Sequence, residues 1–297
     1  MDTDLRGIYA PLPTPFGDGD QVDEAELRRL VRYTAPFLDG IIANGSTADF
    51  PVLSLTERRR VVEIVREEVG PRKRVIAGVG AIATQEAAAL AKSVQAQGVD
   101  AALVVTPYYV RPSAAGLHSH FQAVAEAVPD LAILVYNFPK LMGQEIPIGV
   151  VGALSHTCSN IIGMKDSSGQ LPYTLGVIEA TPSTFNVLVG HGALLLPGVA
   201  MGAAGGILAA ANLVPHAYRA MYEAALSNDW TTARALQSRV YPVAELVARY
   251  GSIAVRAGFR LLGFGIGPPR APLSDSGTLT AMDTEVLQRA LKDLENV

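Results

Sequence analysis

One of the chain's five lysines, Lys165, stands in "NIIGMKDSSG" (160–169), at the end of an apolar run and before a Ser-Ser-Gly turn. A charged lysine resists full burial, and a lysine in an apolar site tends to release its proton. The neutral amine is a nucleophile that attacks carbonyl carbons. The placement therefore predicts covalent chemistry at Lys165. An exposed lysine paired with the neighbouring Asp166 is the alternative that position alone leaves open.

Polar side chains also follow most of the other short apolar runs. Those suited to chemistry are Thr14, Asn44, Ser46, Thr47, Asp49, Thr106, Tyr108, Tyr109, Tyr136, Asn137, His191 and Asn212. If the runs are parallel strands of one barrel, residues at their carboxyl ends meet at one mouth. An amine, a phenol that relays protons, and hydroxyls that hold a carboxylate together with backbone N–H groups are what a Schiff-base enzyme requires.

The histidines do not have the spacing of a metal site. Only His118 and His120 are close in the sequence, whereas ligands on a helix usually stand three or four residues apart and so share one face. We therefore expect no metal and no separate cofactor, and a covalent imine between lysine and substrate in their place.

The elements that must position these residues alternate along the chain. Apolar runs predict strands at 7–10, 40–43, 74–79, 100–105, 131–136, 160–165, 185–189 and 204–208. Amphipathic stretches predict helices between them, such as 23–37, 56–69 and 84–97. Asp23 and Thr56 are the predicted N-caps, and only Asp23, with Glu26, completes a capping box.

Strands that are apolar on both faces and alternate with helices indicate a parallel sheet covered by helices. Eight such units predict the α/β class and a closed (β/α)₈ TIM barrel. A doubly wound open sheet is the alternative, but no GxGxxG motif follows the first runs.

The pattern changes after residue 212, where consecutive helices are predicted at 215–227, 230–250, 252–263 and 280–295. We divide the chain into a barrel core at 1–212 and a barrel-closing and C-terminal helical region at 213–297. The second part is predicted to form a helical appendage.

Composition narrows the class of protein. Hydrophobic residues make up 49% and charged residues 18%, which permits a large core and excludes wholesale disorder. The net charge of −4 and the lack of a basic run argue against nucleic acid as a partner. Cys158 is the only cysteine, no signal peptide is visible, and the apolar stretch 194–215 is interrupted by glycines and prolines. We expect a cytoplasmic protein that does not contact membranes.

Four motifs follow one another along the chain, namely "NGSTADFPVLSLTER" (44–58), "VVTPYYVRPSAAGLHSHF" (104–121), "LVYNFP" (134–139) and "GMKDSSG" (163–169). Together with the tail "RLLGFGIGPPRAPL" (260–273), they resemble the dihydrodipicolinate synthase/N-acetylneuraminate lyase family. The resemblance implies a pyruvate-dependent class I aldolase on a (β/α)₈ barrel.

The resemblance also implies roles for individual residues. Lys165 would form the imine with pyruvate or another 2-oxo acid, and Tyr136 would relay protons to and from the hydroxyl of the aldehyde partner. Ser46 and Thr47 would bind the 2-oxo acid carboxylate. Tyr109 would complete a proton relay across a subunit contact, which implies a homo-oligomer, commonly a homotetramer. Two further residues are predicted to bind substrate, namely Ser167 and Gly190.

The chain departs from the family pattern at three places. Dihydrodipicolinate synthases carry an arginine two positions after the Tyr-Asn-x-Pro motif, which holds the carboxylate of the aldehyde; here Leu141 stands there, beside Lys140. Sialic acid lyases carry acidic residues after the seventh strand; here "GHGALLLPG" (190–198) offers His191, to which we assign no role. Asp49 replaces a glutamate, which is expected to weaken the support of the Ser46–Thr47 turn.

These departures favour a lyase that makes or breaks the C3–C4 bond of a 4-hydroxy-2-oxo acid, such as 4-hydroxy-2-oxoglutarate or a 2-keto-3-deoxy sugar acid. Pyruvate and a small aldehyde would be the products or the reactants. The alternatives are 4-hydroxy-tetrahydrodipicolinate (dihydrodipicolinate) synthase, a 2-keto-3-deoxy sugar acid dehydratase, and a non-catalytic relative that binds a 2-oxo acid.

Overall fold

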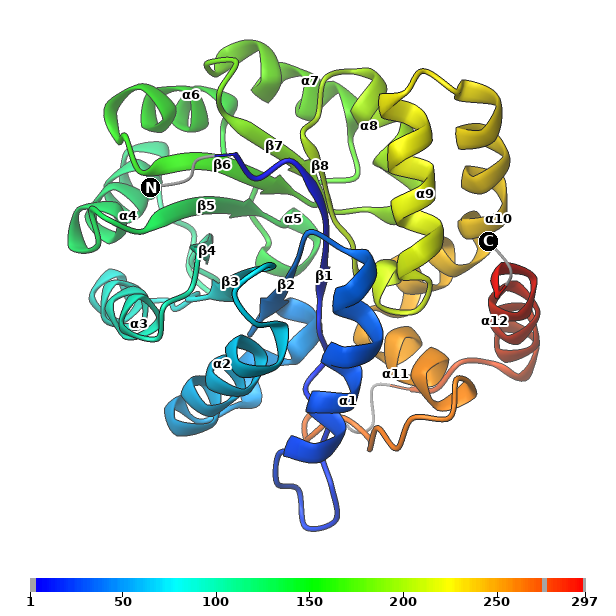
Figure 1. Ribbon diagram of the computed structural model, residues 1–297. Helices are drawn as coiled ribbons and strands as arrows, with labels where there is room; N and C mark the ends of the chain where they lie inside the picture. The colour runs from blue at the N-terminus through cyan, green and yellow to red at the C-terminus, as the bar shows by residue number, and fades with distance from the viewer. Residues whose placement is uncertain (1–3, 274–276, 296–297) are drawn as a thin grey trace.

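Eight parallel strands close into a barrel at the centre of the fold, each paired with its neighbours in the sequence and β1 paired with β8 (Figure 1). The computed structural model describes residues 4–273 and 277–295. The strands are β1 (Gly7–Pro11), β2 (Gly40–Ala43), β3 (Arg74–Gly78), β4 (Ala101–Val105), β5 (Ala132–Asn137), β6 (Ile161–Asp166), β7 (Asn186–Val189) and β8 (Gly205–Ile207). All eight predicted strands are confirmed, and the doubly wound sheet is wrong.

Helices surround the barrel and then continue beyond its last strand. The first eight are α1 (Glu24–Thr34), α2 (Leu55–Val69), α3 (Thr84–Ala96), α4 (Ala114–Ala127), α5 (Pro139–Met142), α6 (Ile148–Thr157), α7 (Leu171–Ala180) and α8 (Leu195–Ala200). The last four are α9 (Pro215–Leu226), α10 (Trp230–Tyr250), α11 (Ser252–Leu261) and α12 (Ala281–Leu294). The four helices predicted after residue 212 are therefore confirmed. The division into two domains at that residue stays a prediction.

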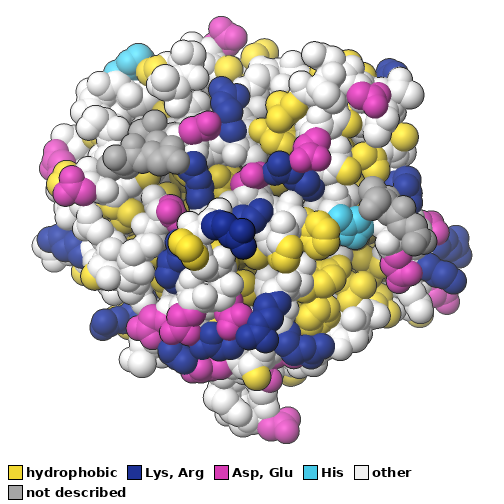
Figure 2. All heavy atoms as spheres, viewed as in Figure 1, with side chains coloured by type: hydrophobic (Ala, Val, Ile, Leu, Met, Phe, Trp, Pro, Cys, Tyr) yellow, Lys and Arg dark blue, Asp and Glu magenta, His cyan; other side chains and the backbone are white. Residues whose placement is uncertain are grey.

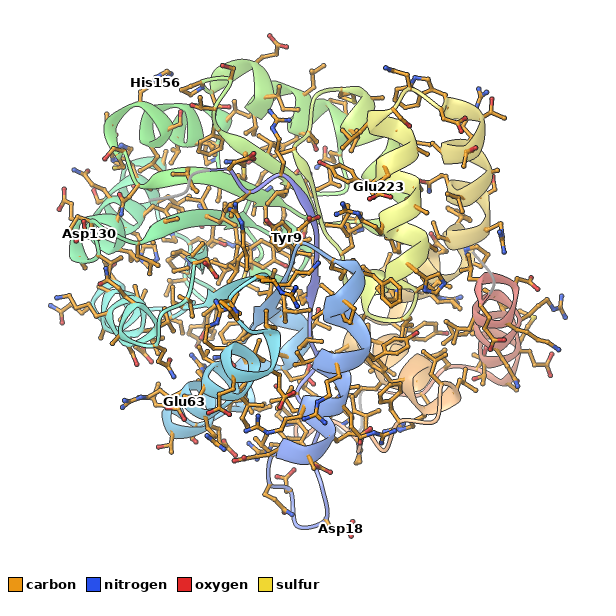
Figure 3. All side chains as sticks on the ribbon, viewed as in Figure 1. Tyr9, Asp18, Glu63, Asp130, His156 and Glu223 are labelled. Carbon is orange, nitrogen blue, oxygen red and sulfur yellow. The ribbon has the colours of Figure 1, made fainter. Side chains whose placement is uncertain are left out.

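Two hydrophobic layers follow from the alternation of side chains along each strand. One layer fills the barrel and includes Tyr9, Leu103 and Leu134. The other lies between the strands and the helices and includes Ile8 and Val104, which neighbour two of those residues in the sequence. Figure 3 shows Tyr9 within the barrel, whereas the labelled acidic residues and His156 lie on its periphery.

The apolar stretch 194–215 is divided among α8, β8 and a 3₁₀ turn at Ala209–Asn212. Within residues 4–273 and 277–295, no helix combines the length and the apolar character needed to cross a membrane.

The N-cap of helix α2 lies two residues before the predicted one. Ser54, and not Thr56, is the N-cap: its hydroxyl accepts from the backbone N–H of Glu57, whose carboxylate accepts from the backbone N–H of Ser54. This reciprocal pair is a capping box. Because "SLTER" offers two hydroxyl residues two positions apart, the sequence pattern alone did not separate them.

Helix α1 has the predicted N-cap, Asp23, but the predicted capping box is wrong, because the Glu26 carboxylate does not return a hydrogen bond to Asp23. The carboxylate of Glu26 instead accepts from the backbone N–H of Gly265 at 2.6 Å and from Arg29 at 2.7 Å. The residue predicted to close the capping box therefore anchors the segment that follows α11.

Charged side chains of both signs alternate over α1 and α2, at the lower edge of the view in Figure 2. Arg28 and Arg32 pair with Glu68, and Arg60 pairs with Glu24 across the two helices. Ion pairs at the protein surface contribute little stability each, about 0–1 kcal/mol. Their mixed signs give this edge no continuous basic surface.

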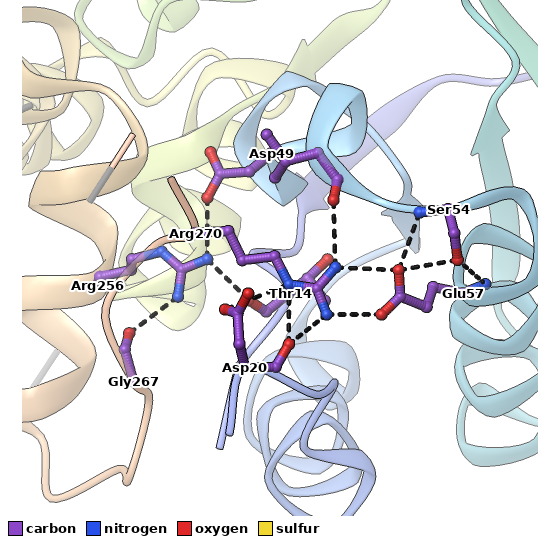
Figure 4. A network of polar contacts seen from close by, with 9 residues as sticks. Thr14, Asp20, Asp49, Ser54, Glu57, Arg256, Gly267 and Arg270 are labelled. Carbon is purple, nitrogen blue, oxygen red and sulfur yellow. Dashed lines mark hydrogen bonds and ion pairs between the residues drawn. The ribbon is translucent and has the colours of Figure 1, made fainter. Parts of the chain in front are cut away.

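The C-terminal region is fastened to the barrel by Arg256 of α11 (Figure 4). This guanidinium is 1% exposed and forms an ion pair of 2.9 Å with the buried carboxylate of Asp49. It also donates to the carbonyls of Thr14 at 2.7 Å and Gly267 at 3.0 Å. One side chain thus joins the loop after β1, the loop after β2 and the segment after α11.

Arg270 fastens the same region a second time. It donates to both carboxylate oxygens of Glu57, at 2.9 and 2.6 Å, and to the carbonyl of Val52 at 3.1 Å. Its guanidinium lies 4.4 Å from the ring centre of Phe16, and that of Arg256 lies 5.3 Å from the same ring. The hydrogen bonds from Arg270 and Ser54 lower the pKa of the Glu57 carboxyl from 4.5 to about 2.

We predict that the Glu57–Arg270 pair stabilises the fold only above acidic pH. Because the pKa of Glu57 is lower in the folded state, its contribution is complete above about pH 4.5 and is lost as the pH falls toward 2. Glu57→Gln removes the charge, and glutamine still suits a capping box. We expect a loss of about 1–2 kcal/mol in the free energy of unfolding at pH 7 and about a quarter of that loss near pH 2.5, measured by chemical denaturation.

Glu63→Gln on the same helix serves as the control, because the Glu63 side chain is 44% exposed and its ion pair with Arg60 is long, at 3.4 Å. Its effect should stay within about 0.5 kcal/mol at both pH values. Equal destabilisation by Glu57→Gln at pH 7 and pH 2.5 would contradict the assigned role of the charge.

Candidate active site

A cavity of about 540 Å³ opens where the strands end. Six predicted site residues line it, namely Ser46, Thr47, Tyr136, Lys165, Ser167 and Gly190. Strand ends from β2, β5, β6 and β7 contribute them, which is the position of active sites in barrels of this kind. These six residues therefore share one cavity, whereas Thr14, Asn44, Thr106, Asn137 and Asn212 of the predicted set do not line it.

Lys165 and Tyr136 stand directly opposite each other on the neighbouring strands β6 and β5. Their side chains are only 4% and 3% exposed, and the amine nitrogen Nζ lies 4.3 Å from the centre of the phenol ring. The alternative of an exposed lysine is therefore wrong. The geometry places an amine and a phenol close enough to act on one bound substrate.

The neighbouring Asp166 faces other partners. Its carboxylate accepts hydrogen bonds from the Asn137 amide at 3.0 Å, the Ser168 backbone N–H at 2.9 Å and the Thr174 hydroxyl at 2.7 Å. Asn137 in turn accepts from the backbone N–H of Ile146 at 3.0 Å. These bonds fix the end of β6 and leave Lys165 without a carboxylate partner among the described residues.

Ser46 and Thr47 lie in a 3₁₀ turn, Ser46–Ala48, bounded by Asn44 and Asp49 with positive φ angles of 54° and 55°. The first N–H groups of such a turn have no partner within it. The Ser46 hydroxyl oxygen is buried and has no hydrogen-bond partner in the described structure. A turn that presents free N–H groups and an unpaired hydroxyl to a cavity suits a carboxylate.

Asp49 holds this turn more firmly than we expected from its short side chain. One carboxylate oxygen accepts from the Ser252 hydroxyl and the other from Arg256, both at 2.9 Å. Burial lowers the pKa of the Arg256 guanidinium, and the Asp49 charge opposes that shift. Both partners belong to α11, so the C-terminal helices support the turn.

Gly190 forms part of the cavity wall because a side chain would not fit there. A Cβ atom on this residue would lie 1.9 Å from the Ser167 hydroxyl oxygen and 3.0 Å from the Asp166 carbonyl oxygen. The wall continues with His191, whose ring nitrogen Nε2 lies 3.3 Å from the Ser167 carbonyl. The turn after β6 and the loop after β7 therefore hold each other.

Two cationic side chains line the cavity. Lys140 on α5 lines it and donates to the Ala248 carbonyl of α10 at 3.1 Å, and Arg249 lines it beside that carbonyl. Leu141, which replaces the arginine of the resembling synthases, is 56% exposed and also lines the cavity. Leu141 therefore shares the cavity wall with Lys140 and with Arg249, whose guanidinium also pairs with Asp283 at 3.5 Å.

Tyr109 does not reach the cavity of its own chain. It is 96% exposed and has a φ angle of 71°, a left-handed conformation that is uncommon for a tyrosine. Tyr108 lines the cavity in its place, with its ring packed against Phe50. The catalytic role of Tyr109 and the homotetramer that it requires stay predictions.

Several wall residues were not predicted to belong to the site. They come from the junction of α10 and α11 (244 and 247–253) and from Leu273. The sequence did contain a sign of this contact. Arg256 lies on the otherwise apolar face of a predicted helix, and an arginine buried there requires a polar or charged partner. Among the described residues, no group of three or more His, Cys, Asp and Glu side chains is placed to hold a metal.

Comparison with known proteins agrees with this geometry. The profile of the dihydrodipicolinate synthetase family matches residues 4–293. A 4-hydroxy-tetrahydrodipicolinate synthase of Protochlamydia amoebophila is 35% identical over 295 residues, covering 98% of this chain and 97% of the relative. One of Methanopyrus kandleri is 37% identical over 297 residues, covering 99% and 98%.

Among solved structures, the 4-hydroxy-tetrahydrodipicolinate synthase of Methylacidiphilum fumariolicum SolV matches with a TM-score of 0.93 at 33% identity, covering 98% of this chain and 96% of that one. Family profile, relatives and fold agree over almost the whole length of the sequence. The chain belongs to the dihydrodipicolinate synthetase family of class I aldolases.

Proposed function

We propose that the chain forms an imine between Lys165 and pyruvate and joins the bound pyruvate to a small aldehyde. The observation that carries the proposal is the buried pair of Lys165 and Tyr136 on adjacent strands, 4.3 Å from amine to ring centre. The unpaired hydroxyl of Ser46 and the N–H groups of its turn support a carboxylate site in the same cavity.

The relatives support one aldehyde over others. They are named for 4-hydroxy-tetrahydrodipicolinate, a six-membered ring with one nitrogen and two carboxylates, seven carbons in all. Three of these carbons come from pyruvate, so the partner is a four-carbon amino acid with an aldehyde group, aspartate 4-semialdehyde. We propose this condensation as the reaction of the chain, in place of the 4-hydroxy-2-oxoglutarate type that the sequence departures favoured.

The proposed reaction has four steps: imine formation, enamine formation, carbon–carbon bond formation and ring closure. The Lys165 amine attacks C2 of pyruvate, water leaves, and the imine forms while Ser46 and Thr47 hold the carboxylate. Loss of a proton from C3 gives an enamine, which attacks the aldehyde carbon, and Tyr136 delivers a proton to the new alkoxide. The amino group of the product then attacks C2 and closes the ring, which releases the Lys165 amine.

A second candidate keeps the same imine and runs on a different substrate. Leu141 lines the cavity where the resembling synthases carry an arginine, so a smaller 4-hydroxy-2-oxo acid remains a substrate class that the site suits. There Tyr136 would remove the proton of the 4-hydroxyl and the C3–C4 bond would break. The enamine left on Lys165 would then be protonated and hydrolysed, which releases pyruvate. Neither reaction requires a metal or a separate cofactor, and we propose that both proceed in a cytoplasmic homotetramer.

A substrate panel tests the proposed function. We expect pyruvate to be consumed when aspartate 4-semialdehyde is added, and ring formation to be detected by mass spectrometry. Pyruvate release from 4-hydroxy-2-oxoglutarate or a 2-keto-3-deoxy sugar acid should be at least about tenfold slower in kcat/KM, since discrimination of about 1.4 kcal/mol suffices for that factor. Faster cleavage of either acid would select the second candidate. No turnover with any of them would select the non-catalytic alternative.

Tyr136→Phe is expected to lower kcat by about 10²–10³-fold, because it removes a proton donor but leaves the ring that packs on Lys165. Pyruvate should still form the imine in this variant, as measured by borohydride trapping. Tyr241→Phe on the exposed face of α10 is the control and should retain normal kcat. A Tyr136→Phe enzyme with unchanged kcat would contradict the proton relay.

A further inference from the structure

A second pair of polar side chains joins the two strands that carry Tyr136 and Lys165. These two residues stand opposite each other on β5 and β6, and the next residues of the register, Asn137 and Asp166, are also opposite. Successive side chains of a strand point to opposite faces of the sheet. Because Tyr136 and Lys165 line the cavity, Asn137 and Asp166 face the layer of helices outside the barrel.

The side chain of Asn137 is fully buried and uses both ends of its amide. Its nitrogen Nδ2 donates to Oδ1 of Asp166 at 3.0 Å, and its oxygen Oδ1 accepts from the backbone N–H of Ile146, ahead of α6, at 3.0 Å. Its backbone carbonyl accepts from the N–H of Ser167 at 2.8 Å. Asn137 therefore fastens the end of β5 both to the end of β6 and to the segment before α6.

Four hydrogen bonds surround the buried carboxylate of Asp166, and all four come from neutral groups. One oxygen accepts from Asn137 and from the backbone N–H of Ser168 at 2.9 Å. The other accepts from the hydroxyls of Ser168 at 3.0 Å and Thr174 at 2.7 Å. A buried charge that loses a donor is costly, so the four partners favour a single arrangement. Among these donors, only the Asn137 amide comes from β5.

The pairing of β5 with β6 is irregular before it reaches the cavity. The register shifts by one residue between Ile133 and Leu134, where β6 contains one extra residue. Irregularities of this kind change the direction of the side chains that follow and recur beside active sites. The pairing before the shift therefore does not determine how the strand ends meet, and the hydrogen bond between Asn137 and Asp166 holds them together there.

We propose that Asn137 and Asp166 are positioning residues, whose hydrogen bond holds Tyr136 at the distance from Lys165 that proton transfer to the substrate requires. This inference rests on the proposed function, in which Tyr136 delivers a proton to an intermediate attached to Lys165. A displacement of about 1 Å can cost about 10²-fold in the rate of such a step. Formation of the imine uses Lys165 without the phenol, so we expect it to be less sensitive to the separation of the two residues.

The test replaces Asn137 by aspartate, which keeps an acceptor for the N–H of Ile146 and sets two carboxylates against each other. We expect turnover of the substrate that the wild type prefers to fall by about 10–100-fold per site that borohydride traps with pyruvate. Turnover per trapped site is the readout, because a role in folding alone would lower turnover and trapping in the same proportion. The double variant Asn137→Asp/Asp166→Asn again places one amide beside one carboxylate and should recover most of the loss.

A pH profile adds a second readout. In Asn137→Asp, a proton shared by the two carboxyls recreates a hydrogen bond between the strands, and such a pair binds its proton more tightly than a single carboxyl does. The loss of turnover relative to the wild type should therefore shrink as the pH falls. Glu145 before α6, Tyr173 of α7 and His191 after β7 also interact with the Asp166 charge. Because these groups are present in both proteins, the ratio of variant to wild type is compared at each pH.

Asn160→Ala is the matched control, because Asn160 is a buried asparagine just before the opposite end of β6. Its amide donates to the carbonyls of Ala125 and Val128 at 3.0 Å and of Leu131 at 3.2 Å. We expect this variant to be less stable, with turnover per trapped site unchanged. An equal loss of turnover per trapped site in Asn160→Ala, or no recovery in the double variant, would overturn the proposal.

The trapping experiment also separates this failure from failure of the proposed function. A wild type that traps no pyruvate at Lys165 would reject the proposed reaction itself. A wild type that traps pyruvate and turns over, together with an Asn137→Asp variant of normal turnover per trapped site, would reject only the positioning role.

Discussion

The ion pair between Asp49 and Arg256 is the constraint on which the site depends, because both charges are buried and neither has access to water. Removing one partner of such a pair leaves an uncompensated buried charge, at a cost of about 3–5 kcal/mol. Here the pair also joins two parts of the chain that are distant in sequence, the turn after β2 and helix α11. The position of the turn that presents Ser46 and Thr47 therefore depends on how the C-terminal helices pack. The helical region beyond the barrel thus takes part in forming the cavity.

The charged side chains in and beside the cavity have different partners. The Asp166 carboxylate is satisfied by Asn137, Ser168 and Thr174, so it does not neutralise the neighbouring Lys165. The lysine amine lies against the Tyr136 ring in an enclosed site, and the remaining cations, Lys140 and Arg249, lie at the mouth. In the proposed reaction, an anionic 2-oxo acid would be attracted by these cations and would meet an amine that no described carboxylate holds in place.

Much of this arrangement could be predicted from the sequence because strands and helices have different periods. The eight apolar runs placed Lys165 and Tyr136 at neighbouring strand ends, and the structure pairs them directly. The ion pair between Asp49 and Arg256, which supports the site, was not predictable in the same way. The two residues are 207 positions apart in the sequence, so their contact leaves no local pattern. Ser54 was missed for a local reason, since two hydroxyl residues compete for one cap. Tyr109 extends away from its own chain, and a single sequence does not show what a second subunit places beside it.

The most direct test of the central claim is mass spectrometry after incubation with pyruvate and sodium borohydride, comparing the wild type with Lys165→Ala. We predict a stable adduct of one pyruvate, mapped to the peptide that contains Lys165 and absent from the folded variant. A folded wild type that acquires no adduct, or one whose adduct maps to another lysine, would contradict imine formation at Lys165 and assign the cavity a different chemistry.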